Sequence, residues 1–169
     1  MTEEILSNMI ITKIHSVSTM YSEKNAGSKR KNRSLWALVI KYEGETRYTS
    51  NGREYISNIN NIAILPKGCD YDWRCVKSGH FSIIEFDCDK SHRDIFSFNV
   101  KNGEMYLKTI KKLEINRFLK RTTYMLDELK DLYGLISSLL HSVEHKYLPS
   151  GKEQKILPAI EYIVKNYIY

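Results

Sequence analysis

The sequence of 169 residues lacks several features that would assign it to a class of protein. Its three cysteines (Cys69, Cys75 and Cys88) are an odd number with no Cys-x-x-Cys spacing, which argues against a disulfide framework. No apolar run approaches the roughly 20 residues that a membrane span requires. Residues 1–4 have neither the basic start nor the apolar core of a secretion signal. We therefore expect a cytoplasmic protein that contacts no membrane.

Catalytic and metal-binding motifs are also scarce. The sequence has no Gly-x-Ser-x-Gly, no phosphate-binding Gly-rich loop and no recognisable Cys–His nucleophile pair, so we predict no catalytic residue and no enzyme. None of the five histidines forms a His-x-His pattern, and we predict neither a metal nor another cofactor. Two alternatives remain: a cluster of Cys75, His80 and Cys88, and His141 with His145 one helical turn apart, though neither has ordinary zinc-module spacing.

A net charge of +6 suggests nucleic acid as a partner, but the charge is unevenly distributed. The stretch from Ser22 to Arg33 holds five basic residues against one acidic residue, and it also contains Gly and Ser. Such a stretch is typically a solvated loop, and phosphate contact there is the less favoured reading.

Short strands with regular turns dominate the middle of the chain. Asn51-Gly52 is the strongest hairpin signal, because both residues tolerate the positive φ of a type I′ turn, and it pairs Tyr48 with Tyr55. Strands at such spacing predict a closed or nearly closed antiparallel barrel or sandwich. The predicted strands are 10–17, 35–40, 46–50, 61–65, 70–75 and 80–88, with further short strands at 95–100 and 105–109.

From Lys111 onward the apolar period becomes helical. One helix, or two joined near Thr122, leads to a further helix that ends near Tyr147. A last helix begins between Lys152 and Pro158. An apolar seam on the second helix predicts packing on its own domain or against a second copy. Its members are Leu132, Ile136, Leu139, Leu140 and Val143.

This order of elements resembles a transcription regulator of the AraC type. The likeness rests on Ile62–Gly68, on Phe81–Phe86, on the Leu132–Tyr147 helix and on the segment Lys155–Ile163. The resemblance implies a mainly β chain: a cupin-like antiparallel β-barrel (a jelly roll) at 1–110, followed by an α-helical hairpin for dimerisation at 111–149. Residues 150–169 would be the first helix of a DNA-binding domain, whose two helix-turn-helix units are missing here.

The resemblance also implies that the barrel binds a small-molecule effector, with a carbohydrate among the candidates. The matching positions are Lys41, Tyr71, Trp73, Phe81, Ile83 and Glu85. Trp73 or Tyr71 would stack on a ring, while Lys41 and Glu85 would bind polar groups. The simpler reading is that the apolar members fill the barrel and that Lys41 and Glu85 are solvated strand ends.

The expected function is therefore that of the sensing and dimerisation part of a regulator. Effector binding would change the order of residues 1–33 or the posture of the helical pair, and so control DNA binding by the missing domain of a homodimer. The alternatives are a stand-alone cupin enzyme (an isomerase or a metal oxygenase) and a barrel that serves only as a dimerisation scaffold.

Overall fold

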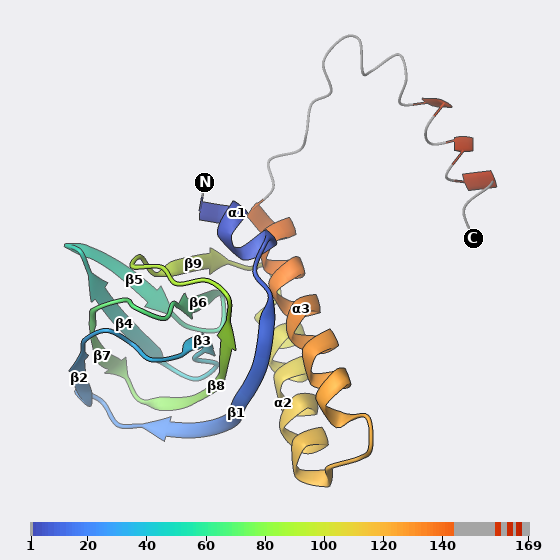
Figure 1. Ribbon diagram of the computed structural model, residues 1–169. Coiled ribbons are helices and arrows are strands. Elements are labelled where there is room, and N and C mark those ends of the chain that lie inside the picture. Colours follow the sequence, from blue (N-terminus) through green and yellow to red (C-terminus); the bar gives the residue numbers. More distant parts are fainter. Residues whose placement is uncertain (1, 144–157, 160–161, 164, 167–169) are drawn as a thin grey trace.

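The computed structural model describes residues 2–143, 158–159, 162–163 and 165–166 (Figure 1). Nine strands are followed by two long helices, and none of the described helices is long and apolar enough to cross a membrane. In chain order the elements are α1 (Thr2–Ser7), β1 (Ile11–Ser22), β2 (Gly27–Arg30), β3 (Trp36–Ile40), β4 (Glu45–Ser50), β5 (Arg53–Ser57), β6 (Asn61–Leu65), β7 (Tyr71–Lys77), β8 (Gly79–Cys88), β9 (Phe96–Asn99), α2 (Gly103–Leu119) and α3 (Tyr124–Val143).

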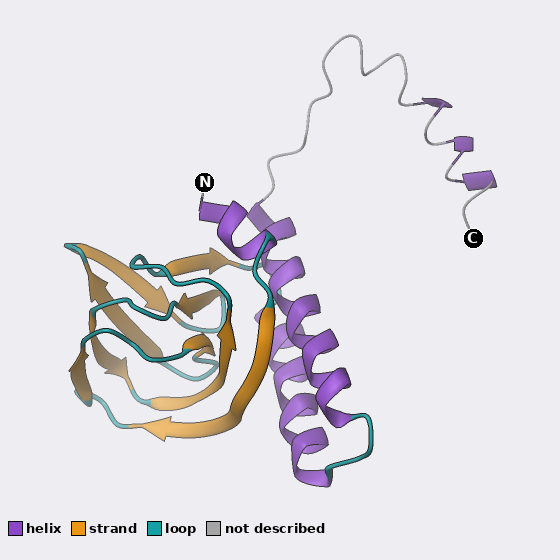
Figure 2. Cartoon of the chain, in the orientation of Figure 1, coloured by secondary structure: helices purple, strands orange, loops and turns teal. Residues whose placement is uncertain are grey.

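The strands form two antiparallel sheets that face each other as a jelly-roll barrel (Figure 2). One sheet has the order β1-β8-β3-β6-β9 and the other has the order β2-β7-β4-β5. The predicted fold class, mainly β with a cupin-like barrel and C-terminal helices, is confirmed. The Asn51-Gly52 turn is also confirmed: both residues have positive φ, and Tyr48 pairs with Tyr55.

The five-stranded sheet is buried on both faces, which explains the continuous apolar runs in β3 and β6. Trp36, Leu38 and Ile40 of β3 face a large core shared with the helices, whereas Ala37 and Val39 face the barrel interior. The barrel therefore has a separate, smaller core, which includes Tyr48, Leu65, Cys69 and Tyr71.

The helices α2 and α3 form an antiparallel hairpin that packs against β1, β8 and β9 (Figure 1). The prediction of a strand at Met105–Thr109 is wrong, because α2 begins at Gly103 and Asn102 caps it by accepting a hydrogen bond from the Met105 N–H. The predicted break near Thr122 is present, but α3 runs without interruption from Tyr124 through the seam. Its predicted end at Tyr147 lies outside the described residues.

Two elements were not expected from the sequence. The basic stretch is partly a strand, since β2 pairs with β7 through Gly27–Arg30 and Lys29 forms a 3.3 Å ion pair with Asp72. The short helix α1 precedes β1 and contacts α3, with Leu6 buried in the larger core. The last segment is described at six positions, all of them helical.

Candidate effector site

A cavity of about 600 Å³ lies inside the barrel, between the two sheets. Its wall comes from both sheets and from the segment that links β2 to β3. Apolar and aromatic side chains form much of the wall, and three cations line it: Arg30 at the end of β2, and Lys31 and Arg33 in the linking segment. The lining residues are Met20, Ser22, Arg30, Lys31, Asn32, Arg33, Ser34, Val39, Thr46, Tyr48, Leu65, Tyr71, Trp73, Phe81, Ile83 and Glu85.

Five of the six sequence-predicted site residues share this cavity. Alternation places Tyr71 and Trp73 of β7 on one wall, and Phe81, Ile83 and Glu85 of β8 on the other. Tyr71 is buried, and the other four are partly exposed. The structure thus brings the predicted set together around one space, although contact with a ligand stays a prediction.

Arg33 is the centre of a polar network at one end of the cavity. Its Nη1 donates to the Tyr71 hydroxyl at 2.8 Å, and its Nη2 pairs with Glu85 at 2.6 Å. The second Glu85 oxygen accepts from the Ser16 hydroxyl at 3.1 Å. The Arg33 Nε is buried and has no partner among the described residues. The guanidinium therefore keeps a free donor beside the cavity.

Burial controls the acidity of the tyrosines that surround Arg33. Desolvation raises the pKa of Tyr71, and the neighbouring Arg33 charge opposes that rise. Burial likewise raises the pKa of Tyr48, whose ring meets Tyr71 edge-on at 5.7 Å. Both phenols are therefore neutral at physiological pH and act as hydrogen-bonding groups rather than as bases.

Lys41 lies behind the cavity wall rather than in it. The side chain is fully buried, so the alternative reading of a solvated strand end is wrong for this residue. Its Nζ donates to the Ser22 hydroxyl at 2.6 Å and to the Gly79 carbonyl at 3.0 Å, and it lies 5.9 Å from the Phe81 ring centroid. Ser22 and Phe81 line the cavity, so Lys41 supports its wall through them.

The predicted seam of α3 is largely buried within its own chain. Leu132, Ile136 and Leu139 belong to the larger core, and Leu140 and Val143 pack partly against it. This burial favours the intramolecular reading for the first three residues. A role in dimerisation stays a prediction, and it now concerns Leu140 and Val143.

The alternative site of Cys75, His80 and Cys88 is not assembled in the described part of the chain. Within residues 2–143 and the six later positions, no three His, Cys, Asp or Glu side chains gather closely enough to hold a metal ion. Each of the three side chains instead makes a hydrogen bond elsewhere. The Cys75 thiol accepts one from the Ser22 hydroxyl, His80 shares one with Glu43, and the Cys88 thiol donates one to the Lys90 carbonyl. His145 lies outside the described residues.

Sequence reasoning missed Arg33 as the centre of the site. The residue was interpreted only as part of a solvated basic stretch, and no local pattern distinguishes it from its neighbours. Its place depends on two long-range backbone hydrogen bonds, from Arg33 N–H to the Cys69 carbonyl (3.1 Å) and from Gly68 N–H to the Arg33 carbonyl (2.8 Å). Only the tertiary fold supplies that signal.

Comparison with known proteins gives the fold but no family. No protein-family model matches the sequence, and no curated protein matches it either. Among solved structures, ToxT from Vibrio cholerae bound to (E)-4-(8-methylnaphthalen-1-yl)but-3-enoic acid is similar, with a TM-score of 0.54 and 13% identity. That match covers 92% of this chain and 67% of ToxT.

Two further structures share the arrangement. Wild-type ToxT with a bound unsaturated fatty acid has a TM-score of 0.51 at 10% identity, covering 94% of this chain and 65% of ToxT. The AraC-like transcriptional activator CuxR has a TM-score of 0.54 at 9% identity, covering 90% of this chain and 62% of CuxR. The chain spans 62% to 67% of the length of these three structures. Its fold is similar to the one found in these structures.

Proposed function

We propose that this chain is the effector-sensing part of a transcription regulator and that it binds a small molecule in the barrel cavity. The observation that carries the proposal is a cavity of about 600 Å³ whose wall combines apolar side chains with a partly buried arginine, Arg33, whose Nε is buried without a partner among the described residues. We further propose a division into a barrel, a helical region and the start of a DNA-binding domain at 150–169, with the helical region beginning at Gly103, where α2 starts, and not at residue 111. The chain would then reach DNA through a domain beyond Tyr169.

The ligand class that suits this cavity is an organic acid with an apolar body. Arg30, Lys31 and Arg33 line the space against a single carboxylate, Glu85, so the lining carries an excess of positive charge. Met20, Val39, Leu65 and others offer an apolar surface for the body of the ligand. The acids bound to ToxT in the similar structures have the same two-part chemistry. A carbohydrate, stacked on Trp73, is the competing class.

Strand β1 offers a path from the cavity to the helices. Met20 and Ser22 of β1 line the cavity, while the neighbouring Thr19 donates to Glu114 of α2 from its N–H (3.1 Å) and its hydroxyl (3.0 Å). Further along β1, the Ile11 N–H donates to the Tyr133 hydroxyl of α3 at 2.7 Å. A ligand that shifts β1 would therefore change the posture of the hairpin, provided that it binds the two postures with different affinity.

Calorimetric titration with three probes tests the ligand class. We expect octanoate to bind, octan-1-ol to bind at least tenfold more weakly, and glucose not to bind. The reason is that a charge-assisted hydrogen bond contributes about 1.5–3 kcal/mol. Arg33→Gln should reduce octanoate affinity to the level of the alcohol. Arg47→Gln is the matched control, because it removes two surface ion pairs and lies outside the cavity lining.

The outcomes separate the ligand class from the function. Equal binding of octanoate and octan-1-ol, unchanged by Arg33→Gln, would reject the acid and leave the cavity as an apolar site. Binding of glucose alone would favour the carbohydrate. If none of the three probes bound at millimolar concentration, the sensing function would lose its support.

We also propose that the regulator is a homodimer that uses the end of α3. Leu140 and Val143 are partly buried and lie beside the core rather than within it. Sedimentation of Leu140→Asp should show a monomer where the parent shows a dimer, with Ser97→Asp, an exposed position on β9, as the control. A parent that sediments as a monomer, or a Leu140→Asp dimer, would reject this interface.

A further inference from the structure

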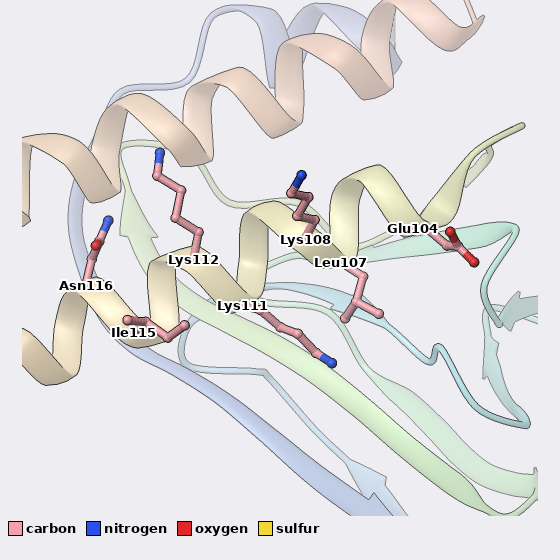
Figure 3. Close-up of a pocket in the computed structure, with 7 residues that line it drawn as sticks. All are labelled: Glu104, Leu107, Lys108, Lys111, Lys112, Ile115 and Asn116. Carbon is pink, nitrogen blue, oxygen red and sulfur yellow. The ribbon is translucent and has the colours of Figure 1, made fainter.

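The outer face of α2 carries a second hollow, separate from the barrel cavity. This groove has a volume of about 580 Å³ and lies along a single helix (Figure 3). Residues four apart on a helix share a face, so the lining side chains follow one line from Glu104 to Ile115. The opposite side of α2 is the buried one, where Tyr106, Ile110 and Leu113 meet the core. The lining residues are Glu104, Leu107, Lys108, Lys111, Lys112, Ile115 and Asn116.

Lysines stand on both sides of an apolar line in this groove. Figure 3 shows Lys112 pointing toward α3, where it pairs with Asp131 at 2.8 Å, and Lys111 pointing toward the strands. The Lys111 Nζ lies 5.0 Å from the Tyr42 ring centroid, and within the described residues neither it nor Lys108 has an ion pair. Glu104 at one end is the single acidic residue of the lining. The groove is therefore basic at its edges.

The apolar line continues beyond the groove to the end of the helix. Phe118 and Leu119 follow Ile115 on the same face. Ile115 is 58% exposed, Phe118 is 86% exposed and Leu119 is 49% exposed. Large apolar side chains that gather on one exposed face mark an interaction surface. From Glu104 to Leu119 the face is about 23 Å long at 1.5 Å per residue, which is the length of about four helical turns.

We infer that this α2 face docks an acidic amphipathic helix of a partner protein. Apolar side chains of such a helix would lie on Leu107, Ile115 and Phe118, while its carboxylates would face Lys108 and Lys111. A second copy of the chain does not suit the face, because a two-fold axis through the groove would bring its lysines against the same lysines. A helix lying in a groove through anchors three and four residues apart is a common mode of recognition.

A designed peptide tests this docking surface on the full chain. The probe is a fluorescently labelled 16-residue helix with Leu at positions three and four apart and Glu beside them, and the control peptide carries Lys in place of Glu. Anisotropy should show binding of the acidic peptide that weakens as salt is raised, and no binding of the basic one. Lys108→Glu/Lys111→Glu should weaken binding at least tenfold. Lys24→Glu/Lys77→Glu, with the same charge change at exposed positions outside the groove, should not.

A second variant tests the apolar line without disturbing the core. Ile115→Ser/Phe118→Ser alters exposed side chains, so the chain should keep its circular dichroism spectrum and melting temperature while losing the peptide. Equal binding of both peptides, or binding that survives both groove variants, would overturn the inference. So would a dimer that Ile115→Ser/Phe118→Ser dissociates, or binding to phosphatidylglycerol vesicles without binding to the peptide. Arg33→Gln should leave peptide binding unchanged, which keeps this test separate from that of the effector site.

Discussion

Single residues show how far the protein interior alters ordinary side-chain chemistry. Lys41 directly follows β3, and it was expected either to contact a ligand, as the resemblance implied, or to be a solvated strand end, yet the fold buries it with two hydrogen bonds. Its partners, Ser22 and Gly79, come from the end of one distant strand and the start of another. No periodic pattern around Lys41 reports them, so the sequence identified the residue as special without giving the correct reason.

The cysteines allow a prediction at this scale. Cys69 is fully buried, and burial raises its pKa to about 11, so little reactive thiolate exists at pH 8. We expect N-ethylmaleimide at pH 8 to modify the partly exposed Cys88 first, and to modify Cys69 only after urea unfolds the chain. Mass spectrometry of peptides from both conditions measures this. Labelling of Cys69 at the rate of Cys88 in native buffer would contradict it.

At the scale of elements, strong local signals predicted well and long-range pairing did not. The hairpin at Asn51-Gly52 was predictable because the turn chemistry is local. By contrast, β2 was missed because Gly27–Arg30 has no apolar alternation and gains its strand conformation from pairing with β7. Asn102-Gly103 suggested a turn between strands, whereas Asn102 is the cap of α2. Asn and Gly are both common in turns and at helix starts, so the local sequence could not distinguish a turn between strands from the start of α2.

Two glycines with open surroundings provide a matched test of backbone conformation. No atom would meet a Cβ at Gly52 or at Gly134, but Gly52 has a φ of +72° while Gly134 lies within the helix α3. Gly52→Ala should lower the free energy of unfolding by about 1 kcal/mol, because left-handed backbone is strained for alanine. Gly134→Ala should raise it by roughly 0.5–1 kcal/mol. Urea unfolding measures both, and a shift of the same sign in the two variants would refute the argument.

Arg117 connects three elements, and its loss should be costly. Its Nη1 pairs with the buried Glu128 of α3 at 3.1 Å, and its Nη2 donates to the carbonyls of Ile14 (3.0 Å) and His15 (2.8 Å) in β1. Burial raises the pKa of Glu128, and the Arg117 charge opposes that rise. Arg117→Leu should cost about 3 kcal/mol of stability, because it leaves a buried carboxylate without a partner.

A double-mutant comparison distinguishes the ion pair from simple packing. Arg117→Leu/Glu128→Leu should be more stable than Arg117→Leu alone, since the second change removes the stranded charge. As a control, Lys112→Leu breaks a pair whose lysine is half exposed, and it should cost no more than about 1 kcal/mol. Additive losses in the double variant would show that Arg117 acts through packing.

For the whole molecule, the order of elements was more informative than any single motif. The succession of strands and then helices predicted a jelly roll with a helical hairpin, and the structure has both. The cavity itself was not predictable from the sequence, because its wall combines seven strands with the β2–β3 link. The sequence pointed to β7 and β8 but could not reveal that Arg33 completes the wall.

Hydrogen exchange can test whether the barrel and the helices act together. If β1 transmits ligand binding, octanoate should slow amide exchange in β1 and in α2 of the parent chain. In Glu114→Ala, which removes the acceptor for Thr19, the slowing should remain in the barrel and disappear from α2. If octanoate still slowed amide exchange in α2 of the Glu114→Ala variant, another route would carry the signal.

The separation of the two cores has a consequence for how such a protein can change. The larger core, between the five-stranded sheet and the helices, contains Trp36, Phe86 and most of the buried aliphatic residues, whereas the cavity adjoins the smaller one. Substitutions that reshape the cavity therefore leave the main source of folding stability untouched. A lineage built on this plan is free to exchange one chemical signal for another while its architecture persists.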